Sequence, residues 1–137
     1  MTVTNSKMSQ SVQYPEVTIE RARRAVRCSP FLLKLYIAMR EEGVFLGEIA
    51  GTAGFKAGYT EIPIPELNAE NDLLWLINVG VLRREVDGQG ITDSFRLTPL
   101  GRLVVREWQE HGESWQGTLT TFDRMTNWLR RWLRLPF

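Results

Sequence analysis

Hydrophobic and polar positions between residues 66 and 108 predict a helix, two short strands and a second helix. The first helix is expected to span residues 66–79 and to be mostly buried. Six apolar residues follow its polar start: Leu73, Leu74, Trp75, Leu76, Ile77 and Val79. Gly80 can end it, since glycine readily adopts a positive φ. Thr98 and Pro99 are suited to begin the second helix, as its N-cap and its first residue.

The two strands between these helices are predicted from alternation. Leu82 and Val86, and then Phe95 and Leu97, alternate with polar residues, so each strand can turn one face to the core. Between them, DGQG and TDS supply turn residues, and the connection is expected to be longer than a two-residue turn. The pattern therefore predicts a small β-hairpin that projects into solvent.

The first half of the chain predicts three further helical stretches. Residues 18–27 form a helix with one narrow apolar face. Ser29 and Pro30 are expected to start a central core helix that ends near residue 42. Phe45, Leu46, Ile49 and Ala50 are spaced for one helical face, but glycines among them indicate a short or irregular helix. Two prolines then keep the chain extended up to residue 65.

This order of parts resembles the winged-helix branch of the helix-turn-helix superfamily over roughly residues 29–111. The residues that match the family's pattern are Gly80, Val81, Leu82, Arg83, Leu97, Thr98, Pro99 and Gly101. The resemblance implies a mainly α fold with a small β-hairpin, in which a winged-helix core is flanked by N- and C-terminal helices. We expect a disordered lead-in (1–15), a winged-helix domain (16–111, wing about 82–98) and a C-terminal amphipathic helix (115–137).

Composition is typical of a water-soluble globular protein. The 137 residues are 43% hydrophobic and 24% charged, with a formal net charge of +1. The single cysteine fits a reducing compartment. The N-terminus lacks the apolar core of a signal peptide, and no apolar stretch approaches the length of a membrane span. We therefore expect a cytoplasmic protein without an integral membrane segment, for which peripheral membrane contact is also not expected.

Charge is unevenly distributed along the chain. Residues 1–40 contain seven basic and two acidic side chains, whereas residues 41–82 contain one basic and seven acidic ones. Residues 83–114 carry a net charge of −1 and residues 115–137 a net charge of +3. The third helix of the winged-helix pattern, which enters the major groove in DNA-binding relatives, lies in the acidic block. Carboxylates beside phosphates oppose DNA binding.

Two functions therefore remain open, and both are non-enzymatic. As a DNA-binding transcriptional regulator, the protein would read bases with Asn68 and Asn71 and hold phosphates with basic side chains of the wing and the first helix. Those basic side chains are Arg83, Arg84, Arg96, Arg23, Arg24 and Arg27. In the alternative, the winged helix is adapted to protein–protein interaction, and its acidic third helix contacts a basic partner. The same arginines could also be ordinary solvated residues.

The C-terminal segment predicts an amphipathic helix that needs a docking surface. Its apolar side comprises Phe122, Met125, Trp128, Leu129, Trp132 and Leu133. Docking on the protein's own core or on a second subunit is the expected arrangement, and we predict a homodimer. A membrane interface and a groove on another protein are the alternatives.

Enzyme chemistry has little support in the sequence. His111, the single histidine, is expected to serve a helix end, and Cys28 is expected to be a buried structural thiol. One histidine and one cysteine are too few ligands for a metal site, so no metal and no cofactor are expected. The glycines between residues 47 and 58 do not form a nucleotide-binding motif.

Overall fold

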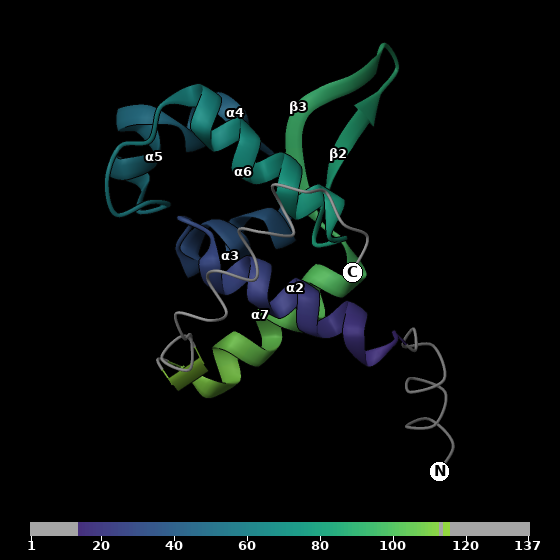
Figure 1. Ribbon diagram of the computed structural model, residues 1–137. Coiled ribbons are helices and arrows are strands. Elements are labelled where there is room, and N and C mark those ends of the chain that lie inside the picture. The colour runs from purple at the N-terminus through teal and green to yellow at the C-terminus, as the bar shows by residue number, and fades with distance from the viewer. Residues whose placement is uncertain (1–13, 113, 116–137) are drawn as a thin grey trace.

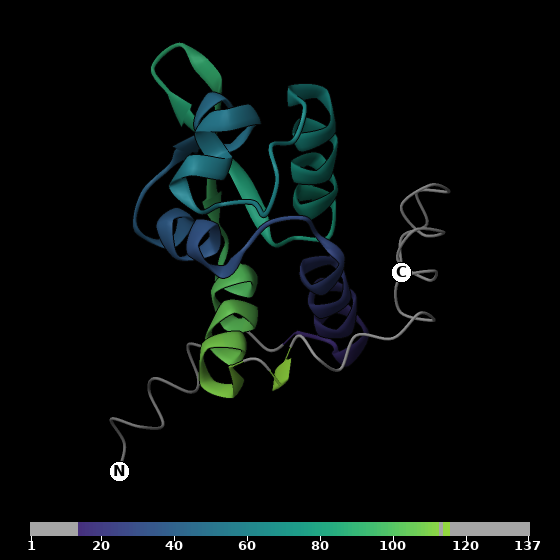
Figure 2. The ribbon, with the colours of Figure 1, turned by 90° about the vertical axis from the view of Figure 1, so that its left-hand side faces the viewer.

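A computed structural model describes residues 14–112 and 114–115 of the chain (Figure 1). The fold is mainly helical and contains the β-hairpin that the sequence predicts, here as part of a small three-stranded antiparallel sheet. Its elements are α2 (Glu16–Cys28), α3 (Leu33–Glu41), β1 (Val44–Phe45), α4 (Leu46–Ile49), α5 (Gly51–Ala57), α6 (Glu66–Asn78), β2 (Leu82–Asp87), β3 (Gly90–Leu97) and α7 (Pro99–His111). Helices α2, α3 and α7 gather at one end of the molecule, and α4, α5, α6 and the hairpin form the other end (Figures 1 and 2).

The sheet places its apolar face on the helical core. Its strand order is β1–β3–β2, and both pairings are antiparallel. Val44 pairs with Phe95 and Leu82 with Leu97, and all four side chains are buried. Strand β1 was not predicted, because residues 44–50 were interpreted as one helical face. Phe45 belongs to β1 and is 55% exposed, so its prediction as part of that face was wrong.

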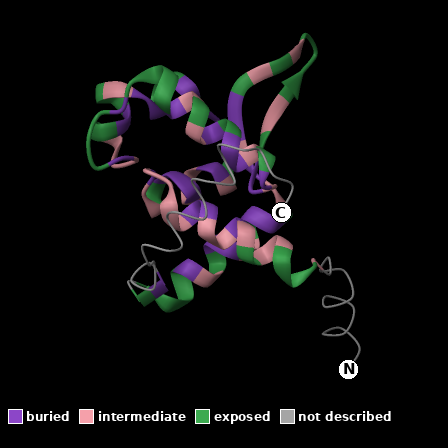
Figure 3. Ribbon diagram, viewed as in Figure 1, coloured by how far each residue is buried: buried purple, intermediate pink, exposed green. Residues whose placement is uncertain are grey.

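The hairpin turn is shorter than predicted. Asp87 pairs with Gly90, so the connection has only two residues, and Gly90 has a φ of 123°. The expectation of a longer turn was wrong because residues 92–94 continue β3, where a register shift between Arg84 and Val86 accommodates them. Val86, expected in the core, is 70% exposed because the hairpin extends beyond the helices (Figure 3).

The second predicted helix starts later than expected. Ser29 does not cap it, because its hydroxyl bonds instead to the Val26 carbonyl, at 2.9 Å, and to the Tyr36 hydroxyl, at 2.7 Å. The chain then forms an isolated bridge between Phe31 and Thr60, and α3 begins only at Leu33. The predicted short or irregular helix is confirmed, since α4 and α5 are separate helices of four and seven residues.

The junction between the sheet and α7 is built as the sequence predicts. Gly80 has a φ of 89° just after α6, and the Thr98 hydroxyl accepts a 3.0 Å hydrogen bond from the Gly101 amide. The same hydroxyl donates to the carbonyl oxygen of Gly80. Gly101 packs so closely that a Cβ at this position would collide with the carbonyl oxygen of Val81. This contact fixes α7 against the end of α6.

The described helices are short. The longest, α2, α6 and α7, have 13 residues each, whereas a membrane span needs about 20. In residues 14–112 and 114–115, therefore, no helix is long and apolar enough to cross a bilayer. Most of the predicted lead-in and of the predicted C-terminal helix lies outside the described residues, so both stay predictions.

Candidate interaction surface

The outward face of α6 is the first candidate surface. Ala69, Leu73 and Leu76 are buried on the inner side of the helix. Residues 67, 71, 74 and 78 share the opposite face by their helical spacing, and all four are exposed. Two of them are leucines: Leu67 is 66% exposed and Leu74 is 41% exposed. Asn68 and Asn71, both predicted as contact residues, are also exposed on this helix.

The exposed leucines were not predicted. The run 73–79 was interpreted as mostly buried, although Leu74 lies on the outer face between Leu73 and Trp75. A helical projection of residues 66–78 could have found this, because Leu67 and Leu74 are seven residues apart and therefore on the same face. The surface of α6 is consequently more apolar than the sequence interpretation assumed, and it carries no Lys or Arg.

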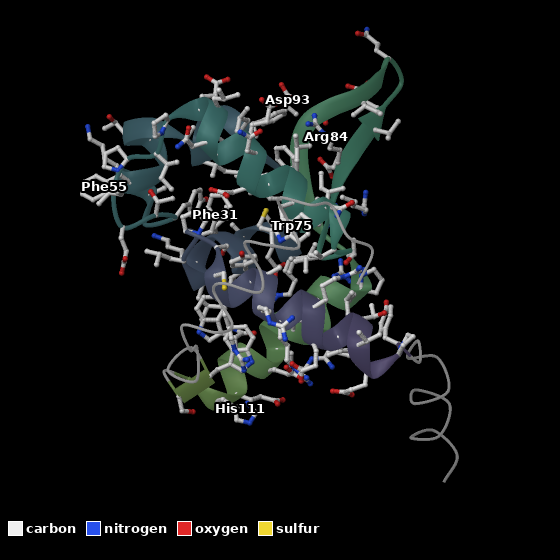
Figure 4. All side chains as sticks on the ribbon, viewed as in Figure 1. Phe31, Phe55, Trp75, Arg84, Asp93 and His111 are labelled. Carbon is white, nitrogen blue, oxygen red and sulfur yellow. The ribbon has the colours of Figure 1, made fainter. Side chains whose placement is uncertain are left out.

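Arg84 and Arg96, two of the three predicted hairpin contacts, are engaged by carboxylates. Arg84 lies between α6 and β3, with Nη1 2.8 Å from Asp93 Oδ1 and Nη2 3.8 Å from Glu70 Oε2 (Figure 4). Its guanidinium also lies over the ring of Phe95, 5.2 Å from the centroid. Arg96 is 3.4 Å from Glu85 and donates to a backbone carbonyl at the end of α3.

Arg83 differs from these two arginines. It is exposed on β2, directly across from Arg96 on β3. No ion pair or hydrogen bond of its side chain is found among residues 14–112 and 114–115. Of the three hairpin arginines, Arg83 is therefore the one that is available to a ligand or partner.

Arginines of the predicted basic face of the first helix make contacts within the protein. Arg23 holds Glu107 of α7 with two hydrogen bonds of 2.8 Å, and it also contacts Glu20, at 2.7 Å, and Glu16, at 3.3 Å. Arg27 lies over the ring of Trp115, 4.6 Å from its centroid. Arg24 is half-buried. Arg23 thus joins α2 to α7, and Arg27 joins α2 to the start of the C-terminal segment.

The ion pair between Arg23 and Glu107 perturbs both groups. The hydrogen bond from Arg23 lowers the pKa of Glu107 below its ordinary value of 4.5, against the opposing effect of partial burial. The same hydrogen bond raises the pKa of Arg23. Both side chains are at least three-quarters shielded from solvent, so we expect this pair to stabilise the fold more than a fully exposed ion pair would.

We expect the pair to make stability depend on pH. A carboxyl with a lowered pKa stabilises the fold above its ordinary pKa, and this contribution is lost as the pH falls through the folded-state pKa. Replacing Glu107 by glutamine should therefore lower the free energy of unfolding by about 1 kcal/mol at neutral pH. Urea unfolding should show this difference disappearing well below pH 4.5. Glu110→Gln, on the exposed side of the same helix, is the control; an equal effect there would contradict the prediction.

An aromatic cluster fixes the start of the C-terminal segment. Trp115 is 4% exposed and stacks on Trp108, with ring centroids 5.1 Å apart. The ring centroid of Trp108 also lies 5.9 Å from that of Tyr36. Tyr36 is completely buried, and this burial raises the pKa of its hydroxyl. Trp115 was not predicted as a docking residue, because it lies before the amphipathic pattern. The predicted docking residues, 122–133, lie outside the described part, so the homodimer stays a prediction.

His111 and Cys28, the histidine and the cysteine considered in the sequence, lie at the ends of two different helices. His111 lies in the last turn of α7, where Nδ1 is 2.8 Å from the carbonyl oxygen of Glu107. Cys28 is half-buried instead of fully buried as expected, because it is the last residue of α2. Within the described ranges, no three His, Cys, Asp or Glu side chains are grouped as metal ligands.

A groove lies beside the N-terminal end of α6. Its volume is about 380 Å³. The groove is lined by Pro30, Glu61, Ile62, Pro63, Ile64, Pro65, Asn68 and Asp72. Most of these residues belong to the extended loop between α5 and α6, which the prolines keep open.

Fold and surface together define a small, mainly helical domain with a three-stranded antiparallel sheet and, next to the hairpin, a helix whose outward face is exposed and carries no lysine or arginine. The chain belongs to the Npun_F0494-like family, which matches it over residues 12–131. No curated protein and no solved structure gave a significant match to the chain.

Proposed function

We propose that this domain is a winged helix adapted to protein–protein interaction. The winged-helix part of the proposal is supported by the order of elements: α6 ends at Gly80, the hairpin follows, and Thr98 and Pro99 start α7. In this interpretation α3 is the first helix, α4 and α5 together replace the second, and α6 is the third. The hairpin β2–β3 is the wing.

The composition of the outward face of α6 is the main support for a protein-binding function. A helix that reads DNA needs phosphate-binding cations around it, because phosphate neutralisation supplies most of the affinity. On α6 the exposed positions are leucine, asparagine and glutamate, and Arg84, which lies beside this helix, is held by Glu70 and Asp93. Exposed leucines that share one face of a helix are instead typical of helices that dock on a partner protein.

The composition of this face also indicates what a partner would look like. Leu67 and Leu74 would enter an apolar strip on the partner, while Asn71 between them and Asn78 after them would form hydrogen bonds. Glu66 and Glu70 border the leucines, so the strip is expected to be flanked by lysine or arginine.

Substituting both leucines tests the proposal. Tagged full-length protein, wild type or Leu67→Asp/Leu74→Asp, is used to capture proteins from extracts of the cells that make it. A protein enriched by the wild type is then purified and titrated against both forms. We expect the double variant to bind at least about tenfold more weakly, because the central apolar contacts are lost.

Val17→Asp is the matched control, since Val17 is also an exposed apolar residue, 55% exposed, but lies on α2. It should bind like the wild type. Circular dichroism should show all three proteins equally folded, because the substituted side chains are exposed. A partner that binds the double variant and the wild type equally would refute the proposed surface.

DNA binding is the second candidate function. It is favoured by one specific observation, the exposure of Asn68, Asn71 and Arg83 on adjacent elements α6 and β2. Asparagine can read adenine edges, and arginine can hold a phosphate or a guanine. Arg23, Arg84 and Arg96 would first have to leave their carboxylate partners.

A titration with labelled random duplex DNA at two salt concentrations separates the two functions. The protein-docking proposal predicts no saturable binding at either salt concentration. Binding that weakens steeply with salt, and that Arg83→Ala reduces several-fold while Lys56→Ala does not, would support the DNA-binding function instead. Lys56 is a suitable control because it is an exposed cation on α5, outside the hairpin.

A further inference from the structure

The groove beside α6 has a chemistry that fits a basic, apolar segment. Ile62 is 67% exposed at its edge, and three prolines and Ile64 complete its apolar walls. Glu61 and Asp72 supply carboxylates, and Asn68 supplies an amide. None of the residues lining the groove is a lysine or an arginine. The groove is thus both apolar and acidic, and its volume is in the range of sites that hold a few side chains.

The chain itself contains a segment of the complementary type. Residues 128–134 read WLRRWLR, in which two tryptophans and two leucines alternate with three arginines. Over the whole stretch 116–137 there are four arginines and one aspartate. Arginine pairs well with carboxylates, and the tryptophan ring packs well against proline and isoleucine.

The described part of the chain ends at Trp115, which contacts the helix that leads into the groove wall. Trp115 lies under the guanidinium of Arg27, 4.6 Å from it, and Arg27 is three residues before Pro30 in the groove wall. Since successive Cα atoms are about 3.8 Å apart, the Cα atoms of Arg27 and Pro30 are within about 11 Å. The C-terminal segment therefore starts next to the end of α2, from which the chain continues into the groove wall at Pro30.

The linking residues are sufficient to reach it. Twelve residues, 116–127, separate Trp115 from Trp128. They would span about 18 Å as a helix and about 40 Å when extended. The groove can thus be reached within one chain, without a second copy.

We propose that residues 128–134 dock in this groove of their own chain, with an arginine on Glu61 and tryptophans on the proline and isoleucine walls. Docking would cover the N-terminal end of α6 next to Leu67. The tail would then compete with any partner for that end of the helix. The docking itself does not require the proposed partner, so the two proposals can fail separately.

Cysteine cross-linking in the full-length protein tests the docking. In a Cys28→Ser background, Ile62→Cys at the groove and Leu129→Cys in the tail are treated with a short bismaleimide at low protein concentration. Mass spectrometry distinguishes cross-links within one chain from those between two chains. We expect an intrachain cross-link whose yield falls about fivefold or more when Arg130, Arg131 and Arg134 are changed to glutamate. Adding Glu61→Lys should restore part of that yield, since the charges then match again.

The matched control replaces Ile62→Cys by Gly88→Cys, because Gly88 is exposed at the hairpin tip with open space around it. A yield no higher than in this control would overturn the proposal. Cross-links only between chains would also overturn it and would show that the tail docks on a second copy. A yield that is insensitive to the charge changes would refute the assignment of the acidic groove as the binding site.

Discussion

Replacing Trp108 by alanine should lower the free energy of unfolding by about 4 kcal/mol, the range of large buried aromatic residues. Trp108 is 5% exposed on α7, and its ring contacts Tyr36 of α3 on one side and Trp115 on the other. Its removal would leave a cavity where α3, α7 and the start of the C-terminal segment meet. Urea unfolding followed by far-ultraviolet circular dichroism measures the loss.

Two controls separate cavity formation from the general effect of losing an aromatic residue. Trp108→Phe retains a ring at the same place and should cost clearly less than Trp108→Ala. Phe55→Ala removes a ring that is 47% exposed on α5 and should also cost much less. If Trp108→Ala were no more destabilising than Phe55→Ala, the aromatic cluster would not be the junction that we describe.

Gly101→Ala is expected to lower the free energy of unfolding by about 3 kcal/mol, although alanine is the better helix former. A Cβ at Gly101 would collide with the carbonyl oxygen of Val81 and come within 3.0 Å of Leu97 Cδ2. A backbone carbonyl cannot rotate away as a side chain can, so α7 would have to shift relative to the end of α6. Thermal and urea unfolding would both report the change.

Gly47→Ala is the matched control for this substitution. Gly47 is also in a helix, but nothing lies within 4 Å of a Cβ built on it. There alanine should leave stability unchanged or raise it by up to about 1 kcal/mol. Equal effects at the two glycines would show that α7 does not need the close approach at Gly101.

Local signals in the sequence were sufficient to predict several elements of the fold. The start of α7 follows from the cap chemistry of Thr98 and Pro99, and the end of α6 follows from Gly80, because both depend on residues adjacent in sequence. The late start of α3 could not be predicted in this way. Ser29 has the right side chain for a cap, but its hydroxyl is used by Tyr36, and Phe31 is held in an extended conformation by its bridge to Thr60.

The candidate site was harder to predict, because it depends on contacts between residues distant in sequence. Arg23 and Glu107 are 84 positions apart, and only the packing of α2 on α7 brings them together. The same holds for Arg84, which Glu70 and Asp93 reach from two other elements. Counting charges along the chain identified the acidic block correctly, but it could not show which arginines are already bound to carboxylates.

The position of β2 at the edge of the sheet has a consequence for the behaviour of the protein in solution. An edge strand offers unpaired backbone groups, and another molecule could add a strand there and begin aggregation. Arg83, Arg84 and Glu85 are consecutive charged residues on this strand, and the register shift that follows Arg84 distorts its pairing. Both features disfavour strand addition. Arg83 and Arg84, which the sequence suggested as phosphate contacts, thus also disfavour self-association through the edge strand β2.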